Sequence, residues 1–433
     1  MTEKKNIRPV APDALLTNTR WSWARLMLLM AVIGPGIITA NVDNDAGGIT
    51  TYSISGASFG YTLLWALVPI TVALCVVQEM ASRLGVYTGK GFADLIRERW
   101  GIRVTFYLMI ALLVVNFANT LAEFAGWAEA LQIFGISKYV SVPIAAFVVW
   151  ILVARANYKT VEKVFLVATL VYVSYVFSGF AAKPDWTLAL KDTLQPQLTG
   201  QPTAYWIMLV GIIGTTIAPW MQFYQQSSVV EKGIKPKDIK MATLDTIVGC
   251  FVAVTVAAFI TFACAATLHQ QGIQVTSAAQ AAKALIPFAG KYAGLLFAIG
   301  LANASLFAAS ILPLSTAYTI SEGMGWEGGV SRSTKEAPQF HAIYTGMIFL
   351  GAAIILIPGV PLIPVIFGSQ VMNGVLMPIT AFFALMLVND RALLGDAVNS
   401  TKYNVLAWAC VGGGAAGSLF MVFSMLFPNF VGG

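Results

Sequence analysis

Long apolar runs recur along the whole chain, and they constrain its fold more than any other feature. A helix needs about 20 mostly apolar residues to cross a bilayer, and such runs are centred near residues 40, 72, 112, 146, 170, 215, 255, 305, 349, 375 and 415. Hydrophobic residues make up 58% of the chain and charged residues 11%, whereas about a quarter of a soluble domain is charged. The sequence therefore predicts an all-α, polytopic membrane protein with eleven spans.

Basic residues lie almost entirely in one of the two sets of connecting segments. If the amino terminus is cytoplasmic, all 26 lysines and arginines fall inside except Lys138, Lys183, Lys191, Lys283 and Lys291. Lys and Arg are retained on the cytoplasmic side of membranes. We therefore expect a plasma-membrane protein with a cytoplasmic tail at residues 1–22 and its carboxy terminus outside. The net charge of +6 follows from this asymmetry and does not indicate a nucleic-acid partner.

The polar connections between the predicted spans are short. None is long enough for a second domain, so the chain is predicted to form one transmembrane domain over residues 1–433, with loops at 183–203 and 324–338. The opening residues lack the apolar core and cleavage site of a signal peptide, and are expected to be retained. The sequence predicts no resident cofactor and no obligate protein partner apart from the lipid bilayer.

The stretch NVDNDAGGIT, residues 41–50, places polar residues inside the first predicted span. Asp43, Asn44 and Asp45 are followed almost at once by two glycines. A carboxylate at this depth costs a few kcal/mol even on a lenient insertion scale, and it marks an ion path or a binding site. The stretch therefore predicts a break in the first span that has a functional role.

The two aspartates of this stretch are expected to have different roles. They are two residues apart, which places them about 200° apart around a helix, so one of them is expected to be the ligand. We expect it to be Asp45, because Asp45 precedes Ala46–Gly48, the segment that unwinds most easily. Asp43 is expected to face a vestibule or to pair elsewhere, and Asn44 is a further candidate for the ion pathway.

A second interruption is predicted in the sixth span, in GIIGTTIAPWMQ, where Gly214 and Pro219 bracket Thr215 and Thr216. Broken helices five spans apart are expected of two five-helix repeats of opposite orientation. In such transporters the substrate site lies between the two breaks, near the membrane midplane. Unwinding also frees backbone carbonyls, which must be satisfied by protein, water or a ligand.

The residues expected at the two breaks offer only oxygen donors and have little side-chain bulk. Transition metals prefer nitrogen or sulfur, whereas Mg²⁺ takes oxygen and keeps several of its waters. A wide pocket with one carboxylate therefore favours a partly hydrated Mg²⁺. Met221 is a nearby sulfur donor that we expect to pack rather than to coordinate. The residues concerned are Asp45, Ala46, Gly47, Gly48, Thr215 and Ala218.

These segments resemble the Nramp family of divalent-metal transporters. GPGIITANVDNDAGG followed by GASFGY resembles the first helix of the family, with its Asp-Pro-Gly-Asn motif at residues 45–48. GIIGTTIAP is similar to the sixth-helix motif, LAEFAG to part of the third helix, and residues 81–101 to the loop after the second helix. GSQV, residues 368–371, resembles a tenth-helix segment whose Gln, here Gln370, helps to ligate metal. The resemblance implies a LeuT-like fold of eleven spans and metal import by alternating access.

The sequence departs from the family pattern at positions that select the metal and at positions that form the proton path. The motif Asn of the family is replaced by Gly48, its sulfur-donating Met by Ala218, and the His after Pro by Trp220. The Asp expected in the third helix is Thr120. These replacements are similar to those in the divergent branch of Nramp-related magnesium transporters. Glu123 is retained; it could titrate, remain neutral or bond to a neighbouring helix.

The expected function is uptake of Mg²⁺, and also of Mn²⁺, without proton coupling. Moving two charges through about 100 mV is worth roughly 4.6 kcal/mol, which is enough to drive uptake alone. The alternatives are a proton-coupled Mn²⁺ or Fe²⁺ symporter and a sodium-coupled amino-acid carrier, whose substrate carboxylate Asp45 would repel. A channel and a membrane-embedded enzyme are further alternatives, but neither break holds the second acid or base that catalysis requires.

Overall fold

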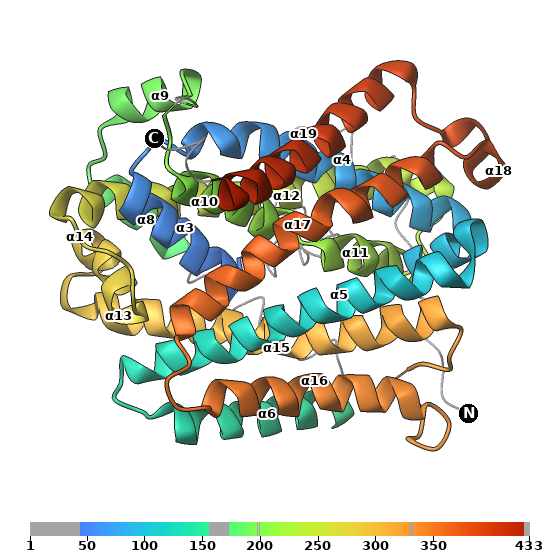
Figure 1. Ribbon diagram of the computed structural model, residues 1–433, viewed down its shortest axis with the longest axis horizontal. Coiled ribbons are helices and arrows are strands. Elements are labelled where there is room, and N and C mark those ends of the chain that lie inside the picture. The colour runs from blue at the N-terminus through green and yellow to red at the C-terminus, as the bar shows by residue number, and fades with distance from the viewer. Residues whose placement is uncertain (1–43, 156–172, 197, 199, 330–331, 428–433) are drawn as a thin grey trace, which may run out of the picture.

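The computed structural model describes residues 44–155, 173–196, 198, 200–329 and 332–427, and in this part of the chain every regular element is a helix (Figure 1). The long helices are joined by short turns, some of which contain a single helical turn. The helices are α3 (Ala46–Phe59), α4 (Leu64–Thr88), α5 (Phe92–Gln132), α6 (Lys138–Arg155), α8 (Val173–Ala181), α9 (Trp186–Leu194), α10 (Thr203–Thr216), α11 (Pro219–Glu231), α12 (Ile239–Thr267), α13 (Ala278–Ala281), α14 (Ile286–Ala289), α15 (Ala293–Met324), α16 (Pro338–Leu356), α17 (Leu362–Val388), α18 (Arg391–Leu394) and α19 (Thr401–Leu426).

The described helices agree with the predicted spans. Eight helical regions are long and apolar enough to cross a membrane, counting α10 with α11 as one. They coincide with the spans predicted near residues 72, 112, 215, 255, 305, 349, 375 and 415, and α6 coincides with the span near 146. The spans predicted near residues 40 and 170 lie mostly outside the described residues, which include only their ends, α3 and α8. Eleven spans are therefore compatible with the structure.

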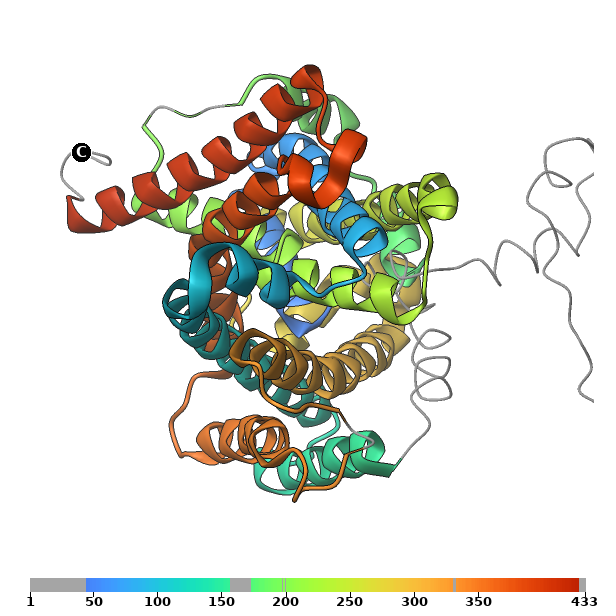
Figure 2. The ribbon, with the colours of Figure 1, turned by 90° about the vertical axis from the view of Figure 1, so that its right-hand side faces the viewer.

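The helices pack in layers around α3. Helices α5 and α15 lie side by side, and the pair α6 and α16 covers one face of them (Figures 1 and 2). Buried apolar side chains fill this outer interface, among them Phe124, Val142 and Ile348. On the other face, α3 is surrounded by α5, α10, α12 and α17. Its residues Ala46 and Ile49 are 0% exposed, so α3 is an internal helix rather than a lipid-facing one.

The sixth span is interrupted as predicted. Helix α10 ends at Thr216, and α11 begins at Pro219. Between them, Ile217 (φ −125°, ψ 62°) and Ala218 (φ −65°, ψ 138°) are not helical. Pro219 occupies the first helical position of α11, where its missing N–H costs nothing. Gly214 is not part of the break, because it lies within α10.

The first span begins a new helix at Ala46, and the expectation that Ala46–Gly48 unwind is wrong. These residues form the first turn of α3, with Asp45 as the N-cap. The Asp45 carbonyl accepts the Ile49 N–H at 3.0 Å. With 14 residues, α3 is about 21 Å long, which is shorter than the roughly 30 Å apolar core of a bilayer. The side-chain cap offsets the weak helix propensity of the two glycines.

Two segments expected to be loops contain helices. The connection at residues 183–203 includes α9, whose first turn is capped by the Asp185 side chain through the N–H groups of Thr187 and Leu188. Residues 81–101, which resemble a family loop, form the end of α4, a short turn and the first part of α5. At Gly101 (φ 79°, ψ 172°) the helix α5 kinks, so its first nine residues form a separate segment before the span.

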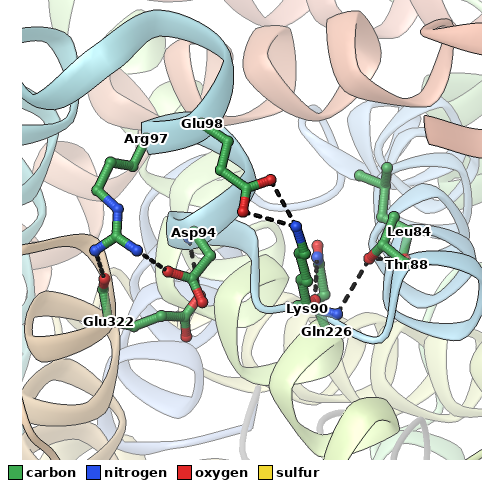
Figure 3. Close-up of polar contacts among 8 residues, drawn as sticks. All are labelled: Leu84, Thr88, Lys90, Asp94, Arg97, Glu98, Gln226 and Glu322. Atoms are coloured by element: carbon green, nitrogen blue, oxygen red, sulfur yellow. Dashed lines mark hydrogen bonds and ion pairs between the residues drawn. The ribbon is translucent and has the colours of Figure 1, made fainter. Parts of the chain in front are cut away.

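A half-buried carboxylate from α15 caps the start of α5 (Figure 3). Gly91 is the N-cap of α5 and has no side chain to satisfy the free N–H groups of the first turn. Glu322 supplies the missing capping group, because its Oε1 accepts the Asp94 N–H at 3.0 Å. Arg97 donates to the Glu322 carbonyl at 2.7 Å and to Asp94 Oδ1 at 2.6 Å. A Cβ at Gly91 would lie 1.9 Å from Glu322 Oε1, so only glycine permits this approach.

The turn between α4 and α5 is also fixed to α11 (Figure 3). The Gln226 side chain donates from Nε2 to the Lys90 carbonyl at 2.9 Å. Lys90 Nζ pairs with both carboxylate oxygens of Glu98, at 2.7 and 2.8 Å. The Lys90–Glu98 ion pair is about half exposed, so it contributes little stability. Gln226 is buried, so its hydrogen bond to the Lys90 carbonyl is the stronger link between the turn and α11.

Candidate functional site

Asp45 lies at the start of α3 with its carboxylate turned toward the first turn. Its Oδ1 accepts the Gly48 N–H at 2.8 Å, and the residue is 7% exposed. Aspartate is one of the strongest N-cap residues, and its charge is favoured by the positive end of the helix dipole. The sequence Asp-Ala-Gly-Gly therefore positions one carboxylate at a helix end inside the protein. Asn44 is buried beside it, and Asp43 lies outside the described residues.

Glu123, from α5, meets Asp45 at the start of α3. It is 0% exposed, and its Oε2 accepts the Ala46 N–H at 3.4 Å. The two carboxylates therefore lie at the same helix end, one accepting the Ala46 N–H and the other the Gly48 N–H. One turn along α5, a Cβ at Gly126 would lie 2.4 Å from Ala46 Cβ. This glycine brings α5 close enough for Glu123 to reach α3.

Gln370, from α17, approaches the same helix start. A Cβ at Gly47 would lie 2.0 Å from Gln370 Nε2 and 3.0 Å from Asp45 Oδ1. The Gln370 amide and the Asp45 carboxylate therefore lie on the same side of Gly47. Gln370 is 2% exposed, so its amide is held inside the bundle near the carboxylate.

Two asparagines that the sequence analysis did not identify orient Gln370. Asn373 donates to Gln370 Oε1 at 2.9 Å, and Asn119 donates to Asn373 Oδ1 at 2.8 Å. Both asparagines are about 1% exposed. Amide side chains in the middle of apolar spans are expensive unless they are paired, and this property could have identified them. Together the three side chains form an uncharged amide network between α5 and α17.

The interruption of the sixth span supplies the opposite side of the site. Because Pro219 has no N–H, the Thr215 carbonyl cannot receive a helical hydrogen bond. The Thr215 hydroxyl is also buried and has no partner among the described residues. The Ala218 carbonyl, in contrast, accepts the Met221 N–H at 3.1 Å and Gln222 Nε2 at 3.3 Å. Thr215 is therefore the free oxygen donor here, and Ala218 serves as a cap.

The two broken spans are joined by direct contacts. The Tyr52 hydroxyl of α3 and the Thr216 hydroxyl of α10 are 2.7 Å apart. A Cβ at Gly214 would lie 2.0 Å from the Gln370 carbonyl oxygen, so α10 and α17 are in backbone contact. The structure therefore brings Asp45, Glu123 and Gln370 together at the start of α3, with the end of α10 held against α3 and α17.

The site can provide oxygen donors of several kinds. Among the described residues, no three His, Cys, Asp or Glu side chains come together in a cluster that could hold a metal. A bound ion would therefore need amide, hydroxyl or carbonyl oxygens in addition to the carboxylates. Trp220, which replaces the family His, and Met221 are each 2% exposed and belong to the hydrophobic core. The carboxy-terminal end of α10 carries partial negative charge, which favours a cation.

An all-helical membrane protein in which an interrupted sixth span packs against a buried helix end that carries a carboxylate has the architecture expected of a broken-helix transporter. The model of the natural resistance-associated macrophage protein-like family, Nramp, matches residues 36–424. The chain belongs to the Nramp family.

Relatives and solved structures agree with this assignment. A divalent metal cation transporter MntH of Deinococcus radiodurans is 26% identical, over 88% of this chain and 86% of that protein. MntH 1 of Pseudomonas aeruginosa is 29% identical, over 92% of each. The structure of a manganese transporter of Eremococcus coleocola, in complex with an aromatic bis-isothiourea compound, has a TM-score of 0.77 and 21% identity, over 96% of this chain and 90% of that one. MhsT in complex with L-phenylalanine has a TM-score of 0.57 and 14% identity, covering 90% and 98% of the two chains. The structural likenesses support the predicted LeuT-like fold.

Proposed function

We propose that the protein imports divalent metal cations across the plasma membrane by alternating access, with Mg²⁺ preferred and Mn²⁺ also carried. The observation that carries this proposal is the site at the start of α3, where the Asp45 carboxylate and the Gln370 amide lie beside the same glycine. The names of the MntH relatives, divalent metal cation transporters, support the general class of substrate. The preference for Mg²⁺ rests on the donors of this chain.

The donors at the site are hard ligands. Carboxylate, amide and carbonyl oxygens suit Mg²⁺ and Mn²⁺, while a thioether would favour softer metals. Ala218 has no donor atom in its side chain, and Met221 is packed in the core. Mg²⁺ is bound through few protein ligands and retains several waters. We propose Asp45, Gln370 and the Thr215 carbonyl as ligands, with Gly48 orienting the carboxylate through its N–H. To ligate, Gln370 would turn its Oε1, which accepts from Asn373, toward the ion.

A second candidate function is proton-coupled symport of Mn²⁺ or Fe²⁺. The position of Glu123 beside Asp45 at the start of α3 favours it, because a cation that binds near two carboxylates would compete there with a proton. The Eremococcus coleocola neighbour, named a manganese transporter, also fits this alternative. Uncoupled transport remains our first proposal, since the membrane potential suffices for a divalent ion and Thr120 and Trp220 replace two groups of the family pattern.

A sodium-coupled amino-acid carrier is less consistent with the site. The fold is shared, and MhsT is described in complex with L-phenylalanine. Such carriers bind the substrate carboxylate at the amino terminus of a half-helix. In this chain the amino terminus of α3 is already capped by Asp45, whose charge would repel a second carboxylate.

Transport in proteoliposomes tests the ion and the coupling separately. With an inside-negative potential of about 100 mV, uptake of Mg²⁺ is expected to exceed that of Mn²⁺, and Ca²⁺ should be excluded by its size. A pH-sensitive dye inside the vesicles should show no acidification that depends on metal. Acidification strictly linked to metal uptake would establish the second candidate, and transport of Mn²⁺ without Mg²⁺ would contradict the ion preference.

Restoring the amide and thioether donors of the family pattern should change the ion preference. The double variant Gly48→Asn with Ala218→Met adds an amide and a thioether where the family has them. The Mn²⁺ to Mg²⁺ ratio of the binding constants is expected to rise by about tenfold, as measured by calorimetry on both ions. Each single variant is the control, and Ala218→Met should produce most of the effect because it supplies the sulfur. An unchanged ratio in the folded double variant would contradict the proposed site.

A further inference from the structure

A pocket of about 670 Å³ lies between α4, α12 and α19, and none of its lining residues belongs to the candidate cation site. Its volume is within the range of small-molecule sites, about 300–1,000 Å³. The two charged residues, the two tyrosines and Ser400 of the lining come from the second half of α4 and the start of α19, whereas the remaining part is mainly apolar, with Thr71 and Thr243 as its hydroxyl groups. The polar lining includes Glu79, Arg83, Tyr87, Ser400 and Tyr403.

The pocket has a polar end and an apolar end. Helix α4 runs toward the polar end, while α12 and α19 begin there and run away from it. The lining therefore changes from polar to apolar in the same direction along all three helices. The polar end is on the side where the predicted inside lysines precede α12. At the apolar end, Val72, Phe251 and Leu406 are 40%, 58% and 41% exposed. In a bilayer these side chains face lipid, so the pocket opens toward the acyl chains of the leaflet predicted to be cytoplasmic.

An acid and a base lie together at the polar end. Glu79 Oε2 accepts from Arg83 Nη2 at 2.5 Å and from the Tyr403 hydroxyl at 2.8 Å. Arg83 Nη1 donates to the Ala397 carbonyl at 3.0 Å, and its guanidinium lies 5.3 Å from the Tyr403 ring centroid. Both bonds of Glu79 use Oε2, so Oε1 can accept from a ligand. Arg83 Nη1 and Nη2 each use one of their two N–H groups, so each can donate one more hydrogen bond.

We propose that this pocket binds a zwitterionic phospholipid with a primary ammonium head group, namely phosphatidylethanolamine. The ammonium would donate to Glu79, and the phosphate would accept from Arg83 and from the Ser400 hydroxyl at the amino terminus of α19. One acyl chain would lie along the apolar end. The pocket holds one negative and one positive group, so a zwitterion adds an opposite charge to each, whereas an anionic lipid adds only a negative charge beside Glu79. A quaternary ammonium has no N–H to donate.

Native mass spectrometry of the full-length protein can test this assignment. The detergent-purified protein is mixed with equimolar phosphatidylethanolamine, phosphatidylglycerol and phosphatidylcholine that carry identical acyl chains. Phosphatidylethanolamine is expected to be retained about tenfold more than either of the others, because only it satisfies both charged groups. Equal retention of the three lipids, or a preference for phosphatidylglycerol, would overturn the proposal. This comparison uses only the wild-type protein, so it does not depend on a variant folding.

Variants then assign the two charges. Glu79→Gln should reduce retention of phosphatidylethanolamine to the level of phosphatidylcholine, and Arg83→Gln should reduce retention of all three lipids. Lys90→Gln with Glu98→Gln is the matched control, since it removes an ion pair that does not line the pocket. An unchanged midpoint of thermal unfolding shows that each variant is folded, whatever ion the protein binds. Unchanged selectivity in a folded Glu79→Gln would also reject the assignment.

Discussion

Replacing Asp45 with alanine is expected to abolish detectable binding of Mg²⁺ and Mn²⁺, a loss of more than about 100-fold in affinity. Even the residues behind a metal ligand change affinity by about 10–100-fold, and Asp45 is the proposed direct ligand. The surroundings increase the effect. The amino termini of α3 and α11 carry partial positive charge, so removal of the carboxylate leaves two positive helix ends near the ion. Calorimetric titration of the purified protein measures the loss.

Two control variants separate the charge of Asp45 from its role as a helix cap. Asn is as good an N-cap as Asp, so Asp45→Asn should preserve the start of α3 and still lose metal binding. Asp185→Ala removes a capping aspartate from α9, outside the candidate site, and should leave metal affinity unchanged. Metal affinity of Asp45→Asn within about threefold of wild type would mean that Asp45 does not bind the ion.

Gly374→Val is expected to prevent the protein from folding stably. A Cβ at Gly374 would lie 2.3 Å from the Val210 carbonyl oxygen, and one at Gly214 would lie 2.2 Å from the Gly374 nitrogen. These neighbours are backbone atoms that cannot rotate away. Overpacking a core typically costs about 1–3 kcal/mol, and separating α10 from α17 should reach or exceed the upper end. We expect a large fall in the midpoint of thermal unfolding, or no monodisperse protein.

Gly368→Ala provides the matched control on the same helix. A Cβ there meets no other atom within 4 Å. Alanine is favoured over glycine inside a helix by about 0.5–1 kcal/mol, so this variant should be as stable as the wild type or slightly more stable. A Gly374→Val protein with an unchanged unfolding midpoint would show that the contact between α10 and α17 is not tight.

Most spans and one of the two breaks could be predicted from the sequence, because they depend on local properties. Apolar length determines the spans, and Pro219 together with its small neighbours determines the break before α11. The start of α3 was harder to predict, because Gly47 and Gly48 have weak helix propensity and the first turn is stabilised by the Asp45 cap. The first nine residues of α5 looked like a loop, and their cap comes from the sequence-distant Glu322.

The composition of the site could be predicted only in part. Asp45 and Gln370 were identified from their position and from the family resemblance, and the structure brings both to the same glycine. The contact of Glu123 with the start of α3 depends on the packing of α5 through Gly126, which no local pattern reveals. Asn119 and Asn373 were missed because their role is to orient Gln370 across two helices. Contacts between distant spans are decided by tertiary packing, not by periodicity.

The short connection between α4 and α5 determines how these two helices can move relative to each other. On one side Gln226 of α11 is bonded to the Lys90 carbonyl, and on the other side Glu322 of α15 is bonded to the first turn of α5. Gly89 has φ 64°, a backbone conformation that glycine adopts without strain. Any change in the angle between α4 and the first segment of α5 that preserves these bonds would have to be absorbed by the turn Gly89–Gly91, whereas the span that follows can change direction at Gly101.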